Sequence, residues 1–193
     1  MLRRTYDWTL SKAEHRLAMW FLAGVAFLES SVFPIPPLVL LVPMVLARPD
    51  RAWLFAFVCT AGSVAGGVFG YFIGAVLFEE IGRPVLELYG KADKFAEFTA
   101  WFNEVGTEAV LIGAITPFPY KVITIASGVT GLSLTTLIFA SILGRGLQYF
   151  GVTFIVWYFG DRAKALIEKH MTLVAIVTAI LLIGGFALVR VIG

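Results

Sequence analysis

Long apolar stretches divided by short polar segments make up most of this chain. The first stretch, residues 17–47, runs for 31 positions with one charge, Glu29. A membrane-spanning helix needs about 20 apolar residues, so the stretch is too long for one span and too short for two. Proline interrupts helices, and the middle of the stretch contains Pro34, Pro36 and Pro37. The pattern predicts a re-entrant hairpin of two short helical arms, closed by a polar turn at residues 48–51.

A second apolar stretch, residues 109–130, has the same form. It contains Pro117 and Pro119 near its middle and a cation, Lys121, directly after them. An offset of 83 residues lays the prolines of the two stretches on one another. Broken helix inside a bilayer is tolerated only where it is buried in protein or lines a water-filled cavity. We predict a second hairpin here, with a single tilted span as the alternative.

Three further apolar stretches are long enough for complete spans. They cover residues 52–78, 134–160 and 171–189, and the second of them carries Arg145. In the first, glycine recurs at every fourth position and forms a stripe on one helix face: Gly62, Gly66, Gly70 and Gly74. Such a stripe lets another helix approach closely, within the chain or between copies of it. The oligomeric state therefore stays open, a homo-oligomer included.

Two segments have a mixed, amphipathic pattern. Residues 1–16 combine basic and aromatic side chains, and residues 79–108 carry seven acidic residues against three basic ones. In the second segment the large apolar residues recur at helical spacing: Phe95, Phe98, Trp101, Phe102 and Val105. We predict a helix at the membrane interface in each segment.

The order of amphipathic helix, hairpin and span thus occurs twice. A hairpin plus one span leaves the chain on the opposite side, so the second copy is expected to be inverted, as in many secondary transporters. The predicted fold is an all-α integral membrane protein with an interfacial helix at 1–16, a membrane domain at 17–165 and a C-terminal transmembrane helix at 171–190. Within the domain, repeat 1 covers about 17–82, the amphipathic connector about 83–107 and repeat 2 about 108–165.

Composition agrees with a membrane protein and excludes other classes. Hydrophobic residues make up 59% of the chain and charged residues 15%, against about 25% charged in an average soluble domain. A net charge of +2 is too small to indicate a nucleic-acid partner. The single cysteine, Cys59, allows no disulfide framework, and His15 and His170 lack metal-ligand spacing. We therefore predict no metal and no cofactor.

Basic residues predict the orientation. The N-terminal segment, the turn at 48–51 and the segment 161–170 are basic, whereas residues 79–108 are acidic. The positive-inside rule places the basic segments, and with them the N-terminus, in the cytoplasm.

Three ionisable groups fall within apolar stretches: Glu29, Lys121 and Arg145. A charge at the bilayer centre costs about 2.5–3.5 kcal/mol, so such groups normally face the bundle interior and mark a transport pathway. The structural alternative is that Glu29 pairs with Lys121 or Arg145 and holds the two repeats together. Two cations against one carboxylate leave a positive charge that suits phosphate. A carboxyl group removed from water is also a candidate proton carrier.

Sequence motifs of common enzymes are absent. The chain has no GxSxG, HExxH or Walker motif, and Glu79-Glu80 lacks the further carboxylate of an EExxxE site. We expect a protein that is not an enzyme.

Several of these residues resemble the DedA family, also called the SNARE-associated or VTT-domain family, and its YqaA-like branch most closely. The resemblance covers roughly residues 17–165. Its most specific parts are the run FLESSVFPIPP at 27–37, the run TPFPYKV at 116–122 and the GRG at 144–146; Gly66–Gly74 and residues 126–129 add to it. By position it implies that Glu29 is the hairpin carboxylate, Lys121 the cation of the second hairpin and Arg145 the cation of the following helix.

The resemblance also implies a function. Family members are implicated in moving lipids between leaflets, and bacterial ones are linked to undecaprenyl phosphate recycling or phospholipid transport, with dependence on the proton-motive force proposed. We therefore expect a transporter or scramblase of phosphate-bearing lipids in the bacterial cytoplasmic (inner) membrane, with Glu29, Lys121 and Arg145 at its substrate site. A proton-coupled small-ion transporter and a non-transporting membrane scaffold are the alternatives. Many relatives have an acidic residue where this chain has Leu38, and two arginines around the second hairpin where it has Lys121.

Overall fold

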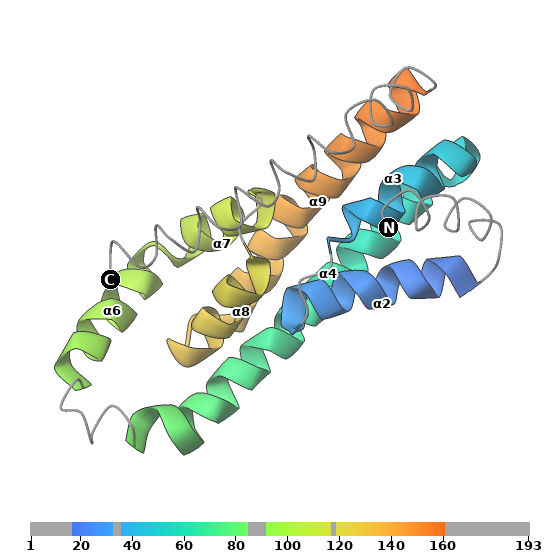
Figure 1. Cartoon of the computed structure of the whole chain (residues 1–193). Coiled ribbons are helices and arrows are strands. Elements are labelled where there is room, and N and C mark those ends of the chain that lie inside the picture. Colours follow the sequence, from blue (N-terminus) through green and yellow to red (C-terminus); the bar gives the residue numbers. More distant parts are fainter. Residues whose placement is uncertain (1–16, 33–35, 85–91, 117–118, 161–193) are drawn as a thin grey trace, which may run out of the picture.

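The computed structural model describes residues 17–32, 36–84, 92–116 and 119–160 of the chain (Figure 1). Within these ranges every regular element is a helix, which confirms the predicted all-α class. The predicted helices at 1–16 and 171–190, and the hairpin prolines Pro34 and Pro117, lie outside the described residues.

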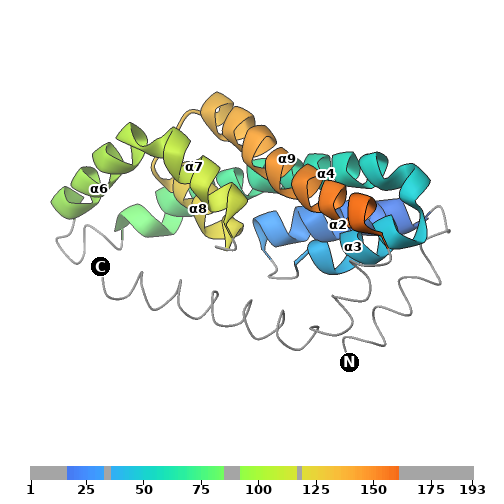
Figure 2. The same ribbon diagram turned by 90° about the horizontal axis from the view of Figure 1, so that it is seen from above.

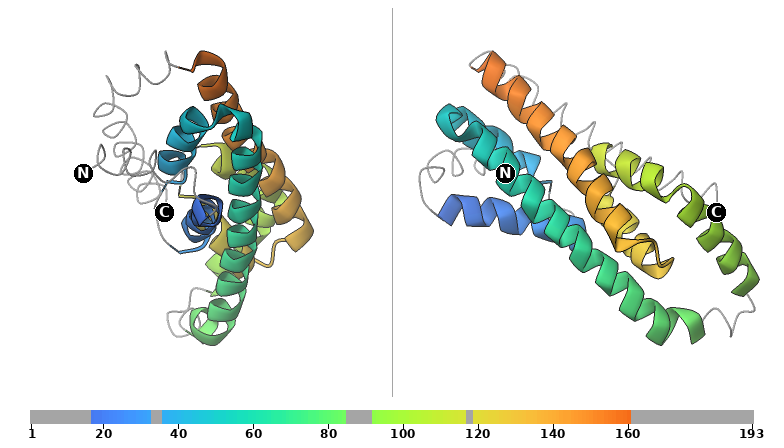
Figure 3. Two further views of the ribbon diagram at one scale, coloured as in Figure 1. Left: turned by 90° about the vertical axis from the view of Figure 1, so that its right-hand side faces the viewer. Right: turned by 180° about the vertical axis from the view of Figure 1, so that it is seen from behind.

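Two long helices form the frame of the molecule. They are α4 (Ala52–Leu77) and α9 (Leu134–Phe159), each 26 residues long and within one residue of the spans predicted from the sequence. A helix of that length extends for about 39 Å, more than the roughly 30 Å of a bilayer's hydrocarbon core. By length and composition, α9 and the continuous helix Pro49–Glu80 that contains α4 can cross a membrane. They run in opposite directions and pack against each other (Figures 1 and 3).

Each long helix follows a pair of short ones. The first pair is α2 (Leu17–Ser31) and α3 (Leu38–Ala47), joined to α4 by the 3-10 turn η1 (Pro49–Arg51). The second pair is α7 (Gly106–Ile115) and α8 (Tyr120–Val129), which precedes α9. One pair lies toward each end of the molecule, and in both the first arm ends and the second arm begins toward the centre (Figures 1 and 2).

Prolines stand at the start of both second arms. Pro37 directly precedes α3, and its carbonyl oxygen accepts from the amide of Leu41 at 2.9 Å. Pro119 directly precedes α8 and accepts from Val122 at 2.9 Å. The first N–H groups of a helix have no intrahelical partner, so a residue without an N–H costs nothing there and ends the preceding helix. The described break residues, Pro36, Pro37 and Pro119, therefore set where the arms begin.

The glycine stripe of α4 makes close approaches to both pairs of short helices. A Cβ atom added at any of the four positions would collide with an atom of a neighbouring helix. The first two glycines lie on α2 and the last two on α8: Gly62 on Ala23, Gly66 on Phe27, Gly70 on Thr124 and Gly74 on Ile125. Gly128 of α8 approaches α4 in return, at Tyr71. The stripe thus binds both short pairs to one long helix.

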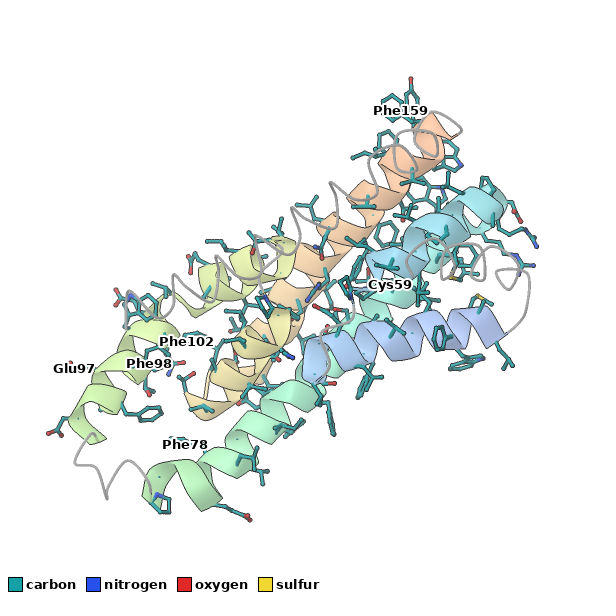
Figure 4. All side chains as sticks on the ribbon, in the orientation of Figure 1. Cys59, Phe78, Glu97, Phe98, Phe102 and Phe159 are labelled. Carbon is teal, nitrogen blue, oxygen red and sulfur yellow. The ribbon has the colours of Figure 1, made fainter. Side chains whose placement is uncertain are left out.

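The connector between the two halves is partly described. It contains a π-helical turn, η2 (Phe78–Gly82), and α6 (Ala92–Glu104). Phe78 stacks on Phe95 with ring centroids 4.5 Å apart, and Phe98 and Trp101 of α6 are exposed (Figure 4). Phe102 is buried against the second half of the chain. The helical spacing of these aromatic residues accordingly gives one helix with a packed side and an exposed apolar side.

Candidate functional site

A buried ion pair joins the two halves of the molecule. Glu29 lies near the end of α2, and Arg145 lies in the middle of α9. The Nη2 atom of Arg145 is 3.0 Å from Oε2 and 3.3 Å from Oε1 of Glu29. The side chains are 4% and 14% exposed for Arg145 and Glu29, so water screens this pair far less than a surface pair. Of the two partners predicted for Glu29, the structure therefore gives Arg145.

Tyrosine rings surround the guanidinium of Arg145. Its Cζ atom lies 4.1 Å from the ring centroid of Tyr120 and 5.8 Å from that of Tyr149, within the range of a cation–π interaction. Its Nη1 atom donates to the Tyr149 hydroxyl at 3.2 Å and to Oε1 of Gln148 at 3.1 Å. Its Nε atom is buried and has no hydrogen-bond partner within the described part of the chain. The Nε–H group of Arg145 can therefore donate a hydrogen bond to a ligand.

Serine hydroxyls extend the ion pair into a network. The Ser30 hydroxyl donates to Oε2 of Glu29 at 3.1 Å and lies 2.7 Å from the hydroxyl of Ser63 on α4. On the other side of the pair, the Tyr149 hydroxyl of α9 accepts from Arg145. The ion pair is therefore hydrogen-bonded to hydroxyls on both of its sides, from α2 and α4 on one and from α9 on the other. Hydrogen bonds that link α2, α4 and α9 in this way favour one packing of the three helices.

Most residues of this network were missed by the sequence prediction, although α9 contains a signal for them. Its buried polar side chains recur at every fourth position: Ser141, Arg145, Tyr149 and Thr153. Residues four apart lie on one helix face, so the spacing itself predicts a polar stripe. Ser141 bonds the hydroxyl of Tyr120, whose ring stacks on Arg145. The Thr153 hydroxyl is buried without a partner in the described part of the chain.

Lys121 lies apart from this pair, at the start of α8 and against the end of α2. Its Nζ atom donates to the backbone carbonyl of Val32 at 2.9 Å, and it makes no ion pair with any described residue. One turn further along α8, the Thr124 hydroxyl lies 3.0 Å from the Ser30 carbonyl oxygen. We call these two contacts, Lys121 to Val32 and Thr124 to Ser30, the tip contact. The three predicted charges thus divide into one buried pair and one cation on a carbonyl.

No group of three or more metal-ligating side chains comes together among the described residues. The groups that the site offers to a ligand are the ammonium of Lys121, the guanidinium of Arg145 and the hydroxyls beside them. Cations with several directed donors bind anions, phosphate above all.

The model of the VTT domain matches residues 33–158, well over half of the chain. The protein belongs to the VTT-domain family. The match includes the second arms, both long helices and the tip residue Lys121, and it confirms the family predicted from the proline and charge motifs. The family is one of membrane proteins, which agrees with the two long apolar helices and indicates a role in membrane transport.

Two relatives are similar over nearly their full length. An uncharacterised protein of Haemophilus influenzae is 29% identical over 185 residues, which are 96% of each chain. A homologous uncharacterised protein of Histophilus somni is 30% identical over 166 residues, 86% of each chain. No solved structure matches the chain. The similarity therefore extends over most of the chain in two proteins of bacterial origin.

Proposed function

We propose that this VTT-domain protein moves a phosphate-bearing lipid, a phospholipid or undecaprenyl phosphate, between the leaflets of a membrane. The observation that carries the proposal is the buried Glu29–Arg145 pair, which joins the first broken helical pair, at α2, to the middle of the long apolar helix α9. Ionisable groups at such a depth normally mark the path of a substrate. The proposal involves no chemical conversion of the lipid, and the protein is not an enzyme in it.

The proposed topology is an inverted repeat. In it α2–α3 and α7–α8 are re-entrant hairpins that enter from opposite faces, and α4 and α9 span the bilayer. Two regularities support this. Both α8 and α9 begin 82 residues after their counterparts, at 120 against 38 and at 134 against 52. The two long helices have equal length and opposite direction (Figure 3). Inverted repeats with broken helices at the midplane are a common plan for secondary transporters.

The proposed location is the bacterial cytoplasmic membrane, with the N-terminus in the cytoplasm. Arg48 and Arg51 in the turn before α4 support this, because basic residues near the ends of spans stay on the cytoplasmic side. The end of the molecule where α4 starts and α9 ends faces the cytoplasm in this orientation, and α6 faces the other side.

The proposed mechanism is an exchange of anions on Arg145. In the empty state Glu29 neutralises the guanidinium, so the buried site has no net charge from this pair. A phosphate headgroup that reaches the site displaces the carboxylate and takes the guanidinium edge, including the Nε donor that has no partner. Arginine binds two phosphate oxygens at once, which favours this exchange. The lipid tail stays in the hydrocarbon, and the displaced Glu29 is the candidate proton acceptor.

A second candidate function is a non-transporting scaffold, and the hydrogen bonds from Ser30, Gln148 and Tyr149 to the Glu29–Arg145 pair favour it. A buried ion pair that is well hydrogen-bonded can serve only to fix the packing of two halves. In a scaffold, exchanging the two charges by Glu29→Arg with Arg145→Glu would preserve function. A transporter of phosphate-bearing lipids would lose activity, because the guanidinium would then lie on α2 without the tyrosine rings that hold it. A proton-coupled small-ion transporter has no separate observation in its favour.

The decisive experiment is leaflet exchange of fluorescent lipids in proteoliposomes. The lipids are a phospholipid and an undecaprenyl phosphate analogue, and the proteins are the wild type and the charge-neutral double variant Glu29→Leu/Arg145→Met. The double variant removes both charges together, so it is expected to fold. Exchange by the wild type and none by the double variant is the expected result. Equal exchange by both, or no exchange by a well-folded wild type with and without a pH gradient, would contradict the proposal.

A matched pair of variants at Lys121 tests the role of the tip in the same assay. Lys121→Ala is expected to reduce exchange, because the headgroup loses its first cation. Lys121→Arg keeps the charge and the donors and is expected to retain most of the activity.

A further inference from the structure

The ammonium of Lys121 caps the end of another helix. The last carbonyl groups of a helix have no intrahelical partner, and the C-terminal end carries a partial negative charge. At the end of α2 the amide of Val32 still bonds back to Leu28 at 2.8 Å, so Val32 belongs to the last turn. Its carbonyl receives Lys121 of α8, 89 positions later in the sequence. The cap is therefore a contact between the two halves and not a local feature of α2.

The second hydrogen bond of the tip contact also joins α8 to the end of α2. Thr124 follows Lys121 by three positions, so both residues lie on the same face of α8. Thr124 is fully buried and its hydroxyl reaches the carbonyl of Ser30. Elsewhere α2 and α8 are each fixed against α4, at Gly66 and Gly74 respectively. Two hydrogen bonds, both from side chains of α8, thus join the C-terminal end of α2 to the start of α8.

These bonds lie next to the buried pair. Ser30, whose carbonyl accepts from Thr124, also holds Glu29 through its hydroxyl. Ser31 beside it is 1% exposed, whereas Val32 is 51% exposed and Lys121 is partly exposed. An anion that approaches from outside therefore meets Lys121 before it meets Arg145.

We infer that the tip contact is a reception site for an anionic phosphate headgroup, and that binding there opens the route to Arg145. The inference rests on the proposed function. A phosphate oxygen is charged and binds an ammonium more strongly than a neutral carbonyl does. When the headgroup takes Lys121, the carbonyl of Val32 loses its cap and the end of α2 is released from α8. Recognition of the substrate and opening of the site are then one event, and a lipid without phosphate does not trigger it.

Accessibility of a cysteine at Ser31 tests the inference directly. Ser31 bonds only carbonyl groups of its own helix, so it lies outside the proposed site and its replacement leaves the tip contact in place. In a Cys59→Ala background, Ser31→Cys is labelled by a maleimide in detergent solution. The rate is compared for Lys121, Lys121→Met, which keeps the length of the side chain, and Lys121→Arg, which keeps the charge. We expect slow labelling with lysine or arginine and labelling at least about tenfold faster with methionine, the factor that corresponds to 1.4 kcal/mol.

The ligand arm uses dihexanoyl phosphatidate, with dihexanoyl glycerol as the uncharged control and inorganic phosphate to separate the headgroup from the tail. We expect phosphatidate to accelerate labelling of the protein that has Lys121 and to leave the Lys121→Met protein unchanged, and we expect no effect of the glycerol lipid. Acceleration by phosphatidate alone assigns the site to whole lipids. Acceleration by inorganic phosphate as well assigns it to the headgroup.

Thr124→Val is the second variant, because it keeps the shape of the side chain and removes the hydroxyl, which lies 3.0 Å from the Ser30 carbonyl and 3.0 Å from the Lys121 carbonyl of its own helix. It is expected to accelerate labelling less than Lys121→Met. Unchanged labelling in both variants, or acceleration by the glycerol lipid equal to that by phosphatidate, would overturn the inference. Lipid exchange by the wild type together with phosphatidate-insensitive labelling leaves the proposed function intact and removes this inference. Phosphatidate-dependent labelling without any lipid exchange supports the anion site at the tip contact and contradicts the proposed function.

Discussion

The two long helices have the same length and a similar pattern but different chemistry. In α4 the residues that recur at every fourth position are glycines, from Gly62 to Gly74. In α9 the residues that recur at every fourth position are polar, from Ser141 to Thr153. Both stripes face the interior of the molecule. The glycines of α4 leave room there for neighbouring helices, whereas the residues of α9 place polar side chains there. One helix therefore provides close packing for both pairs of short helices, and the other provides the charge that the site needs.

The two halves of the chain also differ in their charged groups. The first half contributes an acid, Glu29, and the carbonyl of Val32, whereas the second half contributes Arg145 and Lys121. Each of these groups has a partner in the other half. Because the acid lies in one half and its cationic partner in the other, the ion pair holds the two halves together.

The largest effect is expected from removing one member of the ion pair on the α9 stripe. Arg145→Met leaves the carboxylate of Glu29 buried without its partner, which costs about 3–5 kcal/mol in the free energy of unfolding. The double variant with Glu29→Leu should recover most of that loss, because neither charge remains. Unfolding in mixed micelles, followed by circular dichroism, measures both. A double variant as unstable as the single one would show that the stripe stabilises the fold by packing and not by charge.

A smaller effect is expected from filling the α4 stripe. Gly66→Ala adds a Cβ atom against the backbone carbonyl of Phe27, which cannot move without its helix, and overpacking of this kind costs about 1–3 kcal/mol. Gly151→Ala on α9 is the matched control, because nothing lies within 4 Å of a Cβ atom there. The control should be neutral or up to about 1 kcal/mol more stable. Thermal unfolding midpoints of the two variants in one detergent compare them, and equal midpoints would remove the distinction between the two helices.

An effect of the same order is expected from the hydroxyl that orients the arginine. Tyr149→Phe keeps the ring beside Arg145 and removes one hydrogen bond to a charged group, which costs about 1.5–3 kcal/mol. Lipid exchange should fall more than stability does, since Arg145 then lacks one of the groups that position it. Exchange and unfolding are measured on the same preparation. An exchange rate unchanged from the wild type would mean that Tyr149 serves packing alone.

The smallest effect is expected at the end of the polar stripe. The Thr153 hydroxyl is buried without a partner in the described part of the chain, so Thr153→Val replaces an unsatisfied group by a methyl group of similar shape. Such a change is close to neutral or stabilising, within about 1 kcal/mol. The unfolding assay used for Arg145→Met resolves it. A loss of more than this would reveal a partner for the hydroxyl and extend the network by one more turn of α9.

Much of the fold follows from local rules that the sequence displays. Prolines end helices wherever they stand, so the breaks in the two short pairs could be placed from Pro36, Pro37 and Pro119. Uniform apolar composition likewise determined the limits of α4 and α9 to within one residue of the observed ends. The π-helical turn at Phe78–Gly82 was not predicted, because no residue in it differs from an ordinary helix end.

The pairing of the charged groups could not be predicted in the same way. Which cation meets Glu29 depends on the rotation of α2 and α9 about their own axes, and that rotation is set by packing between helices rather than by either sequence alone. Ser30 and Ser63 resemble the small residues of any close helix contact, so their hydrogen bonds are visible only once α2 and α4 are placed together. Lys121 was predicted as a substrate cation, and the structure shows in addition that its ammonium donates to the Val32 carbonyl.

The separation of Glu29 from its partner has a consequence for biosynthesis. The two residues are 116 positions apart, and a ribosome that adds about 5–20 residues per second needs roughly 6 to 23 seconds to make that length. For all of that time α2 exists with an acidic side chain and without the arginine that neutralises it. The final ion pair, and with it the contact of α2 with α9, can therefore form only after the last long helix has been made.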